Sequence, residues 1–234
     1  MIFSQLPLSF KLKDDATFAN FYPGKNVAAL SCLWSVSKGQ GEQFVYLSGF
    51  SGVGKTHLLQ AVCHATLSYG VSSLYLPLKE STLIETEYLL GLENLENLDV
   101  ICLDDLDKVA GCFKEEEALF HLYNRIRENG GTLLVASKIY PIQSEFQLPD
   151  LTSRLGCGVM NRIFSLNDEE KLAALQLRAQ VRGLSLDETV GGFLLRRCPR
   201  DMLKLFSALE KLDKAALANQ RRLTIPFVKI ILGF

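Results

Sequence analysis

The residues of this sequence best suited to chemistry form a glycine-rich loop at residues 49–56. Its sequence, GFSGVGKT, fits the pattern G-x-x-x-x-G-K-S/T in full. Such a loop wraps its backbone around phosphate groups and directs N–H groups at them, and the dipole of the following helix adds to the attraction. Lys55 would reach the β- and γ-phosphates of a nucleotide, and the Thr56 hydroxyl would hold Mg²⁺. The loop therefore predicts a binding site for a nucleotide and its magnesium ion.

A second pair of candidate residues follows an apolar run at residues 100–103, which ends in Asp104 and Asp105. At the tip of a strand, Asp104 could reach the magnesium shell, and Asp105 could polarise an attacking water. Acidic residues often end strands without any such role, so this run alone is a weak signal. Because it follows the phosphate loop in the chain, we interpret it as the second motif of the same site.

The elements that must position these residues alternate between strand and helix. Apolar runs bounded by turn residues predict strands at residues 44–48, 71–78, 98–103 and 132–137. Helical spacing of apolar residues predicts helices at 57–69 and 116–127. Such alternation implies crossover connections and a mainly parallel sheet covered on both faces, an α/β fold. The phosphate loop lies between the first strand and the first helix, as its motif requires.

From Asp168 onward the sequence predicts only helices, at residues 171–182, 188–197, 201–218 and 226–232. Thr224 is a plausible cap for the last one, and Pro226 falls in its first turn, where a missing N–H costs least. Residues 1–17 alternate apolar and polar positions and then become charged, which is typical of an exposed tail. We therefore expect an N-terminal tail at 1–17, an α/β domain at 18–165 and a helical domain at 166–234.

Composition excludes several classes of protein. The chain has 234 residues, 48% of them hydrophobic, and a formal net charge of −1, which disfavours a protein that binds the DNA backbone. The six cysteines show no C-x-x-C spacing, the start lacks the features of a signal peptide, and no apolar stretch is long enough to span a membrane. We expect a reduced, cytoplasmic protein with little or no sequence-specific DNA binding and no membrane contact.

These motifs, in this order, resemble the AAA+ ATPases of the DnaA group over nearly the whole chain, and most closely the short homologues in that group. The resemblance implies a P-loop AAA+ parallel-sheet domain closed by a small all-helical lid domain. Residues 17–24 resemble the family's entry segment, which lies against the adenine, so Tyr22 and Pro23 are expected there. The nucleotide-binding residues implied by the phosphate loop and the turn after it are Ser51, Gly52, Val53, Gly54, Lys55, Thr56 and His57.

Two arginines gain a role from the same resemblance. Residues 151–155 match a box whose arginine acts as a finger on a neighbouring subunit's nucleotide, which implies that Arg154 is catalytic. Residues 199–202 fall where the family keeps its second sensor arginine, which implies that Arg200 binds nucleotide at the start of a lid helix. Without the resemblance, surface salt bridges would explain both side chains.

Two features depart from the family pattern. Lys138 follows the expected strand at 132–137, where DnaA-like chains usually carry an acidic sensor residue. A lysine cannot accept a hydrogen bond from water near the γ-phosphate, so we expect weak intrinsic ATPase activity. The sequence also stops at Phe234, where DnaA proper continues into a basic helix-turn-helix domain, so we expect no origin binding.

Residues 5–10, QLPLSF, resemble the short peptides that dock on the bacterial sliding clamp. Leu8 and Phe10 would fill an apolar pocket, and the Gln5 amide would form a hydrogen bond at its rim. An alternating edge strand would look identical. The resemblance thus implies a clamp-binding site made of Gln5, Leu6, Leu8 and Phe10.

The expected function is regulation of replication initiation. Tethered to the DNA-loaded clamp of DNA polymerase III, the chain would promote hydrolysis of ATP held by DnaA and prevent re-initiation. Its own cofactors would be ADP or ATP and Mg²⁺, and homo-oligomers are possible. The alternative is a stand-alone AAA+ ATPase akin to helicase loaders, in which Asp105 would be catalytic for the chain's own hydrolysis. The two functions can be distinguished by whether ATPase activity appears with this chain alone or only when DnaA and the DNA-loaded clamp are present.

Overall fold

Five parallel strands form one sheet in the computed structural model, which describes residues 12, 16–78 and 95–234. The strands are β1 (Phe44–Ser48), β2 (Ser73–Pro77), β3 (Val100–Asp104), β4 (Thr132–Ser137) and β5 (Val159–Arg162). Their order is β2-β3-β4-β1-β5, with every neighbouring pair parallel. The four predicted strands and their parallel arrangement are confirmed, whereas β5 was missed because its four residues, VMNR, are only partly apolar.

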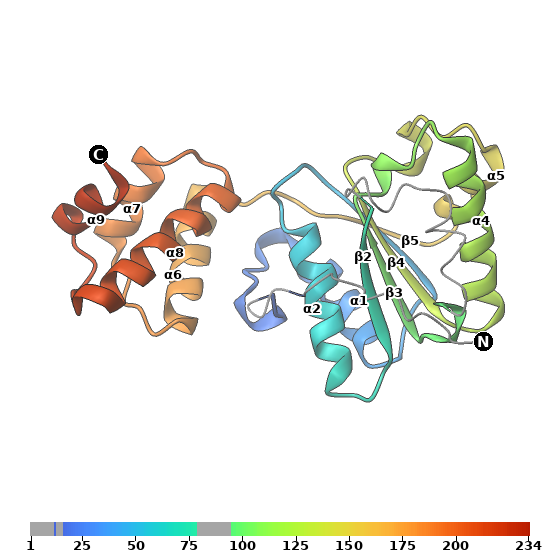
Figure 1. Ribbon diagram of the computed structural model, residues 1–234, viewed down its shortest axis with the longest axis horizontal. Coiled ribbons are helices and arrows are strands. Elements are labelled where there is room, and N and C mark those ends of the chain that lie inside the picture. Colours follow the sequence, from blue (N-terminus) through green and yellow to red (C-terminus); the bar gives the residue numbers. More distant parts are fainter. Residues whose placement is uncertain (1–11, 13–15, 79–94) are drawn as a thin grey trace, which may run out of the picture.

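Helices cover both faces of this sheet. Figure 1 shows α1 (Val27–Ser37) and α2 (Lys55–Leu67) on one face, with α4 (Phe113–Glu128) and α5 (Pro149–Gly156) on the other. Alternate residues of each strand supply the two cores: Tyr46 packs toward α4 and α5, while Val45 and Leu47 pack toward α1 and α2. The fold is therefore the α/β layered sheet expected from the alternation of elements.

The helix boundaries differ from the sequence prediction in two ways. Helices α2 and α4 each begin earlier than predicted, and α1 and α5 were not predicted at all. Apolar and small residues occupy all sides of α1, including the exposed Val27 and Trp34, so this segment shows little helical periodicity. Short 3₁₀ helices occur between the longer elements: Phe18–Asn20, Gly24–Asn26, Leu95–Asn97, Leu106–Lys108 and Pro141–Gln143.

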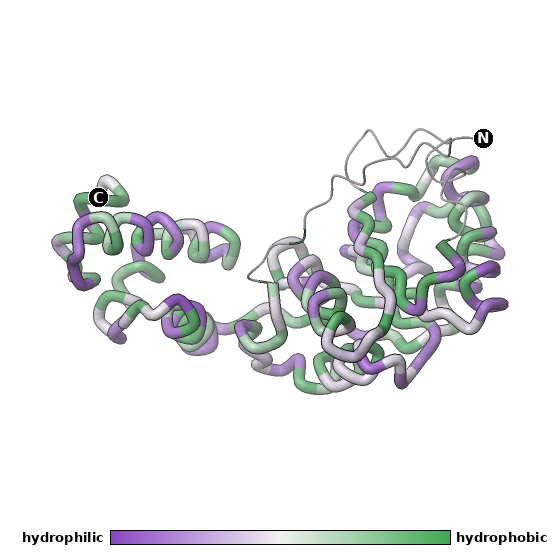
Figure 2. Tube along the Cα trace, turned by 60° about the horizontal axis from the view of Figure 1, so that its bottom comes forward, coloured by the Kyte–Doolittle hydropathy of each residue, from purple (hydrophilic) through white to green (hydrophobic). Residues whose placement is uncertain are grey.

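The C-terminal part consists of α6 (Asp168–Val181), α7 (Glu188–Arg197), α8 (Met202–Asn219) and α9 (Ile225–Leu232). These helices confirm the prediction and surround a core of their own, centred on Leu175, Leu194 and Leu212. Figure 2 shows hydrophobic and hydrophilic positions alternating along them, as expected where one face of each helix is packed. Asn167, Asp187 and Asp201 cap the N-termini of the first three with hydrogen bonds to backbone N–H groups.

The segment between β5 and α6 is held by a side-chain amide. Asn26, which is buried, donates from Nδ2 to the carbonyl oxygen of Phe164 at 3.2 Å, and the Phe164 N–H donates to Asn26 Oδ1 at 2.7 Å. Nearby, a Cβ atom at Gly24 would lie 2.8 Å from a methyl carbon of Leu166. The entry segment before α1 therefore packs against the start of the helical part.

The folded domain begins before residue 17, the predicted end of the N-terminal tail. Ala16 is buried and Leu12 packs against the core between the sheet and α2, so these two positions do not belong to an exposed tail. The proposed clamp-binding residues at 5–10 lie outside the described residues. None of the helices in the described ranges combines the length and apolar character of a membrane-crossing segment. All six cysteines are free thiols.

Candidate functional site

The phosphate loop joins β1 to α2 at the carboxyl edge of the sheet. Gly52 and Gly54 have φ angles of 82° and 102°, in the left-handed region that favours glycine. A Cβ atom at Gly54 would lie 2.7 Å from Phe21 Cε2, and one at Gly52 would lie 2.8 Å from Asp201 Oδ2. Backbone conformation and close neighbours therefore both favour glycine at these positions. Helix α2 begins directly after Gly54, so Lys55 and Thr56 of the loop form its first turn.

Lys55 is folded back onto the loop. Its Nζ atom donates to the carbonyl oxygens of Gly49 at 2.7 Å and Phe50 at 3.0 Å, and the side chain is buried. Burial lowers the pKa of Lys55, and the carboxylates of Asp104 and Asp105 oppose this by favouring the charged form. An ammonium held by carbonyl oxygens can exchange them for phosphate oxygens, which is the role predicted for this residue.

The two predicted magnesium ligands are brought together across the site. The Thr56 hydroxyl, in the first turn of α2, donates to Asp104 Oδ2 at 2.6 Å. The same oxygen accepts from the Tyr75 hydroxyl at 2.9 Å, and the Asp105 N–H donates to Asp104 Oδ1 at 2.9 Å. Burial raises the pKa of Asp104, although the hydrogen bond from Thr56 opposes this. The carboxyl group is thus oriented by three donors before any ligand arrives.

The donors of this pair suit magnesium. A hydroxyl and a carboxylate are hard oxygen ligands, and Mg²⁺ is usually held by one or two protein ligands together with phosphate oxygens and water. Within the described residues, no group of three or more His, Cys, Asp or Glu side chains could hold a metal ion. Thr56 and Asp104 would therefore supply two ligands to a magnesium ion, and nucleotide phosphates and water would supply the others.

Asp105 has an unusual backbone conformation. With φ 56° and ψ 42° it lies in the left-handed region, directly after β3 and at the start of the 3₁₀ helix Leu106–Lys108. Such a conformation is uncommon for a residue other than glycine and tends to occur at functional sites. Asp105 is only partly buried, so its carboxylate remains accessible beside Asp104.

An aromatic residue of the entry segment, Phe21, contacts the phosphate loop. Phe21 packs against Gly54, and its ring centroid lies 5.6 Å from that of His57, whose Nε2 lies 2.8 Å from the Thr17 carbonyl oxygen. Tyr22 and Pro23, which the sequence singled out, are partly buried neighbours in the same segment. Phe21 belongs to the entry segment at residues 17–24 that the sequence singled out, although only Tyr22 and Pro23 of that segment were assigned to the nucleotide.

The helical part reaches the loop through the start of α8. Asp201 accepts hydrogen bonds from the Leu203 and Lys204 N–H groups through Oδ1, while Oδ2 faces Gly52. The adjacent Arg200 is exposed and lies 3.2 Å from an oxygen of Asp168, in α6. The structure thus places Arg200 one residue from a direct contact with the phosphate loop.

Arg154 lies away from all of these residues. It is exposed in the last turn of α5, on the opposite face of the sheet from α2 (Figure 1). Because α5 leads into the first residue of the parallel strand β5, Arg154 lies toward the amino edge of the sheet, while the loop lies at the carboxyl edge. Leu151 and Leu155 anchor the helix in the core. Among the described residues, Arg154 has no ion-pair partner.

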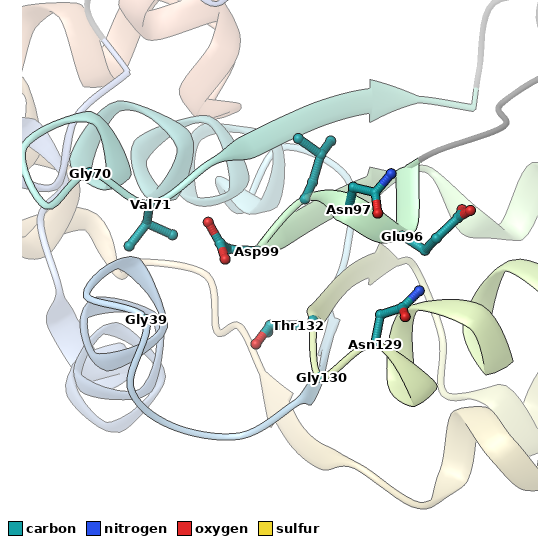
Figure 3. A pocket seen from close by; sticks show the side chains of 11 residues that line it. Gly39, Gly70, Val71, Glu96, Asn97, Asp99, Asn129, Gly130 and Thr132 are labelled. Atoms are coloured by element: carbon teal, nitrogen blue, oxygen red, sulfur yellow. The ribbon is translucent and has the colours of Figure 1, made fainter.

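A separate polar cavity lies at the amino edge. It has a volume of about 490 Å³ and includes Asp99, Asn129 and Thr132 in its lining (Figure 3). The Asp99 carboxylate accepts hydrogen bonds from the hydroxyl and N–H of Ser72 at 2.6 and 2.8 Å, and these bonds lower its pKa. None of the predicted site residues lines this cavity, so it is distinct from the predicted nucleotide site.

Two family models match this chain, one over the sheet domain and one over the C-terminal helices. The model for the bacterial DnaA ATPase domain matches residues 12–162, and the model for the Hda lid domain matches residues 168–232. Domain III of the Thermotoga maritima replication initiation protein DnaA is 22% identical and has a TM-score of 0.81, with 96% of this chain and 98% of that chain covered.

Two further structures of DnaA share the fold. The AMPPCP-bound DnaA from Aquifex aeolicus is 22% identical, with a TM-score of 0.72 over 89% of this chain and 67% of that one. A DnaA bound to AMPPCP and single-stranded DNA is 20% identical, with a TM-score of 0.73 over 91% and 70%. These likenesses confirm an AAA+ fold of the DnaA type with a helical lid. Since the ATPase-domain model alone matches more than half of the sequence, the chain belongs to the bacterial DnaA family of AAA+ proteins and is Hda-like in its lid.

Proposed function

We propose that this chain regulates replication initiation by promoting hydrolysis of ATP held by DnaA. In this proposal the chain binds an adenine nucleotide and Mg²⁺ in its own site and presents Arg154 to the nucleotide of DnaA. The observation that carries it is the separation of Arg154 from the chain's own phosphate loop, on opposite edges of the sheet.

The proposed nucleotide site rests on the assembled loop. Lys55 supplies the cation, Thr56 and Asp104 supply oxygen ligands at 2.6 Å from each other, and the N-terminus of α2 faces the loop. Phe21, Tyr22 and Pro23 would border the base, and Arg200 would approach the phosphates from the lid. Magnesium, when bound, would neutralise charge on the phosphates, and the chain's own residues would orient the nucleotide around it.

Arg154 is suited to act on a partner. Its helix is fixed by the buried Leu151 and Leu155, while the guanidinium stands in solvent. A guanidinium delivered to another subunit's nucleotide stabilises the charge that develops on the transferred phosphoryl group. Its planar fork matches two phosphate oxygens, which a lysine cannot do. In this position, Arg154 would act on a nucleotide only when a second protein binds to this face.

The clamp tether is proposed from residues 5–10 together with the Hda-type lid. Holding this chain at the clamp would raise its effective concentration for DnaA that is encountered at replicating DNA. In the described part of the chain, Leu12 and Ala16 already contact the core. The tether would therefore hold the ATPase domain close to the clamp.

The test is a reconstituted hydrolysis assay with ATP-loaded DnaA, DNA-loaded clamp and this chain, each omitted in turn. We expect rapid hydrolysis only when all three are present, because Arg154 acts on the nucleotide of DnaA. Hydrolysis by this chain alone at a similar rate would contradict the proposal and favour a stand-alone ATPase.

A further inference from the structure

Two cysteines are in contact in the core between the sheet and helix α2. The Cys63 thiol, in α2, donates to the sulfur of Cys102, in β3, and the two sulfur atoms lie 3.7 Å apart. Both side chains are buried, and both belong to the apolar cluster that also contains Leu59 and Val62. A disulfide needs its sulfur atoms about 2.05 Å apart, so a small approach of α2 to β3 is enough to join this pair.

The cysteine pair lies on the same interface as the proposed magnesium ligands. Thr56 and Cys63 are seven residues apart in α2, which places them two turns apart on one face of the helix. Cys102 and Asp104 are two residues apart in β3, so their side chains leave the same face of the strand. The contact of Thr56 with Asp104 at 2.6 Å and the contact of the two sulfur atoms at 3.7 Å are therefore two points of one packing interface.

A change in spacing at the cysteines would reach the phosphate loop through α2. Close-packed protein interiors transmit strain, and a helix moves largely as one unit. The first two residues of α2 are Lys55 and Thr56, which supply the proposed phosphate and magnesium contacts. Drawing the two sulfur atoms from 3.7 Å to about 2.05 Å would shift the helix toward β3 and displace Lys55 and Thr56 relative to Asp104.

We propose that Cys63 and Cys102 are a site of reversible oxidation, and that the disulfide between them weakens nucleotide binding by the phosphate loop. The effect on binding rests on the proposed nucleotide site, whereas formation of the bond does not. Both thiols are free in this structure, which is the reduced form of the pair. Disulfides in reducing compartments are usually transient and regulatory, so the bond would form under oxidising conditions and be removed by a thiol reductant.

A peroxide is the oxidant in this reaction. Hydrogen peroxide converts the Cys63 thiol to a sulfenic acid and releases one water. The sulfur of Cys102 then attacks the sulfenic sulfur, the S–O bond breaks, and the departing hydroxide takes the Cys102 proton and leaves as a second water. The two thiols together lose two electrons, which the peroxide gains. Cys63 reacts first because local opening of α2 exposes it, while Cys102 lies in the inner strand β3.

The bond is tested in the full chain by treatment with hydrogen peroxide, blocking of the remaining thiols with iodoacetamide, digestion and mass spectrometry. A linked pair of peptides carrying Cys63 and Cys102 is expected, and dithiothreitol removes the link. Replacing Cys112 and Cys157 together by Ala is the matched control, since it removes the two exposed thiols and retains the linked pair. Links that involve only the other cysteines would overturn the inference.

Titration calorimetry with ADP and Mg²⁺ tests the consequence for binding. The oxidised chain binds ADP about fivefold more weakly than the reduced chain, as expected when one hydrogen-bonded contact is weakened, and dithiothreitol restores the affinity. Peroxide leaves the affinity of Cys63→Ala and of Cys102→Ala unchanged, because neither variant can form the bond. A linked chain with unchanged ADP affinity would overturn the inference while leaving the proposed function standing. If the reduced chain binds no ADP, the proposed nucleotide site itself is wrong, and the linked peptides alone decide whether the bond forms.

Discussion

The Thr56 hydroxyl lies 2.6 Å from Asp104 Oδ2 and so links the first turn of α2 to the tip of β3. The two residues are 48 positions apart in the sequence. Replacing the hydroxyl by a methyl group in Thr56→Val removes one proposed magnesium ligand at nearly constant volume. We expect ADP to bind this variant with the same affinity in the presence and absence of Mg²⁺, as measured by titration calorimetry.

Thr66→Val is the control for this prediction. Thr66 lies in the same helix, and its buried hydroxyl donates to the carbonyl oxygen of Cys63 at 2.7 Å, away from the loop. Its replacement should leave the magnesium dependence intact. A Thr56→Val variant that retained the full magnesium dependence would remove Thr56 from the metal site.

Lys55→Ala tests the cation of the phosphate loop. The change removes a full positive charge that the structure places on the loop carbonyls. We expect nucleotide affinity to fall at least about tenfold, equivalent to about 1.4 kcal/mol. Calorimetry on a variant shown to be folded by circular dichroism measures this, and unchanged ADP affinity would contradict the assignment of the loop.

Gly54→Ala tests the close approach of Phe21 to the loop. Both Gly54 and Gly130 have left-handed φ angles, 102° and 77°, but only the Cβ at Gly54 meets a neighbour, at 2.7 Å from Phe21. We expect Gly130→Ala to cost about 1–2 kcal/mol from backbone strain alone, and Gly54→Ala to cost more. Urea unfolding compares them, and equal losses would show that the Phe21 contact is unimportant.

The N-terminal segment is tested by replacing Leu8 and Phe10 with Ala. The double variant should lose binding to the sliding clamp, because both proposed apolar anchors are removed. Nucleotide affinity and thermal stability should stay nearly unchanged, since these residues are expected to form a tail. Surface-bound clamp provides the binding measurement, and a destabilised variant that still binds the clamp would point to a core strand.

The sequence predicts the nucleotide site well where the signal is local. The phosphate loop, the strand leading to Asp104 and the helices of the lid each follow from residue type and spacing over a short stretch. Tyr75 was missed because its contact with Asp104 depends on how distant segments pack, and the contact of Phe21 with Gly54 could not be predicted for the same reason. The ion pair between Lys138 and Asp107, at 3.0 Å, could not be predicted either, because it depends on the strand order that places β4 beside β3.

Elements without periodicity were also missed. Helix α1 consists of apolar and small residues on all sides, and β5 has only four residues at the edge of the sheet. Neither carries the alternation that distinguishes a strand or an amphipathic helix from a loop. These two elements matter to the site, because β5 leads to Phe164 and α1 begins directly after Asn26, the two residues that are hydrogen-bonded to each other.

The most direct measurement of the central proposal compares Arg154 with Asp105 in the hydrolysis of DnaA-bound ATP at the DNA-loaded clamp. Arg154→Ala and Arg154→Lys should each retain nucleotide and clamp binding yet lose the stimulation, which for arginine fingers is about 10³–10⁵-fold. Arg127→Ala, which removes an exposed arginine from α4, should retain it. Asp105→Asn, which alters only the chain's own site, should also leave it largely intact. An essential Asp105 together with a dispensable Arg154 would contradict the proposal and place the chemistry in this chain's own site.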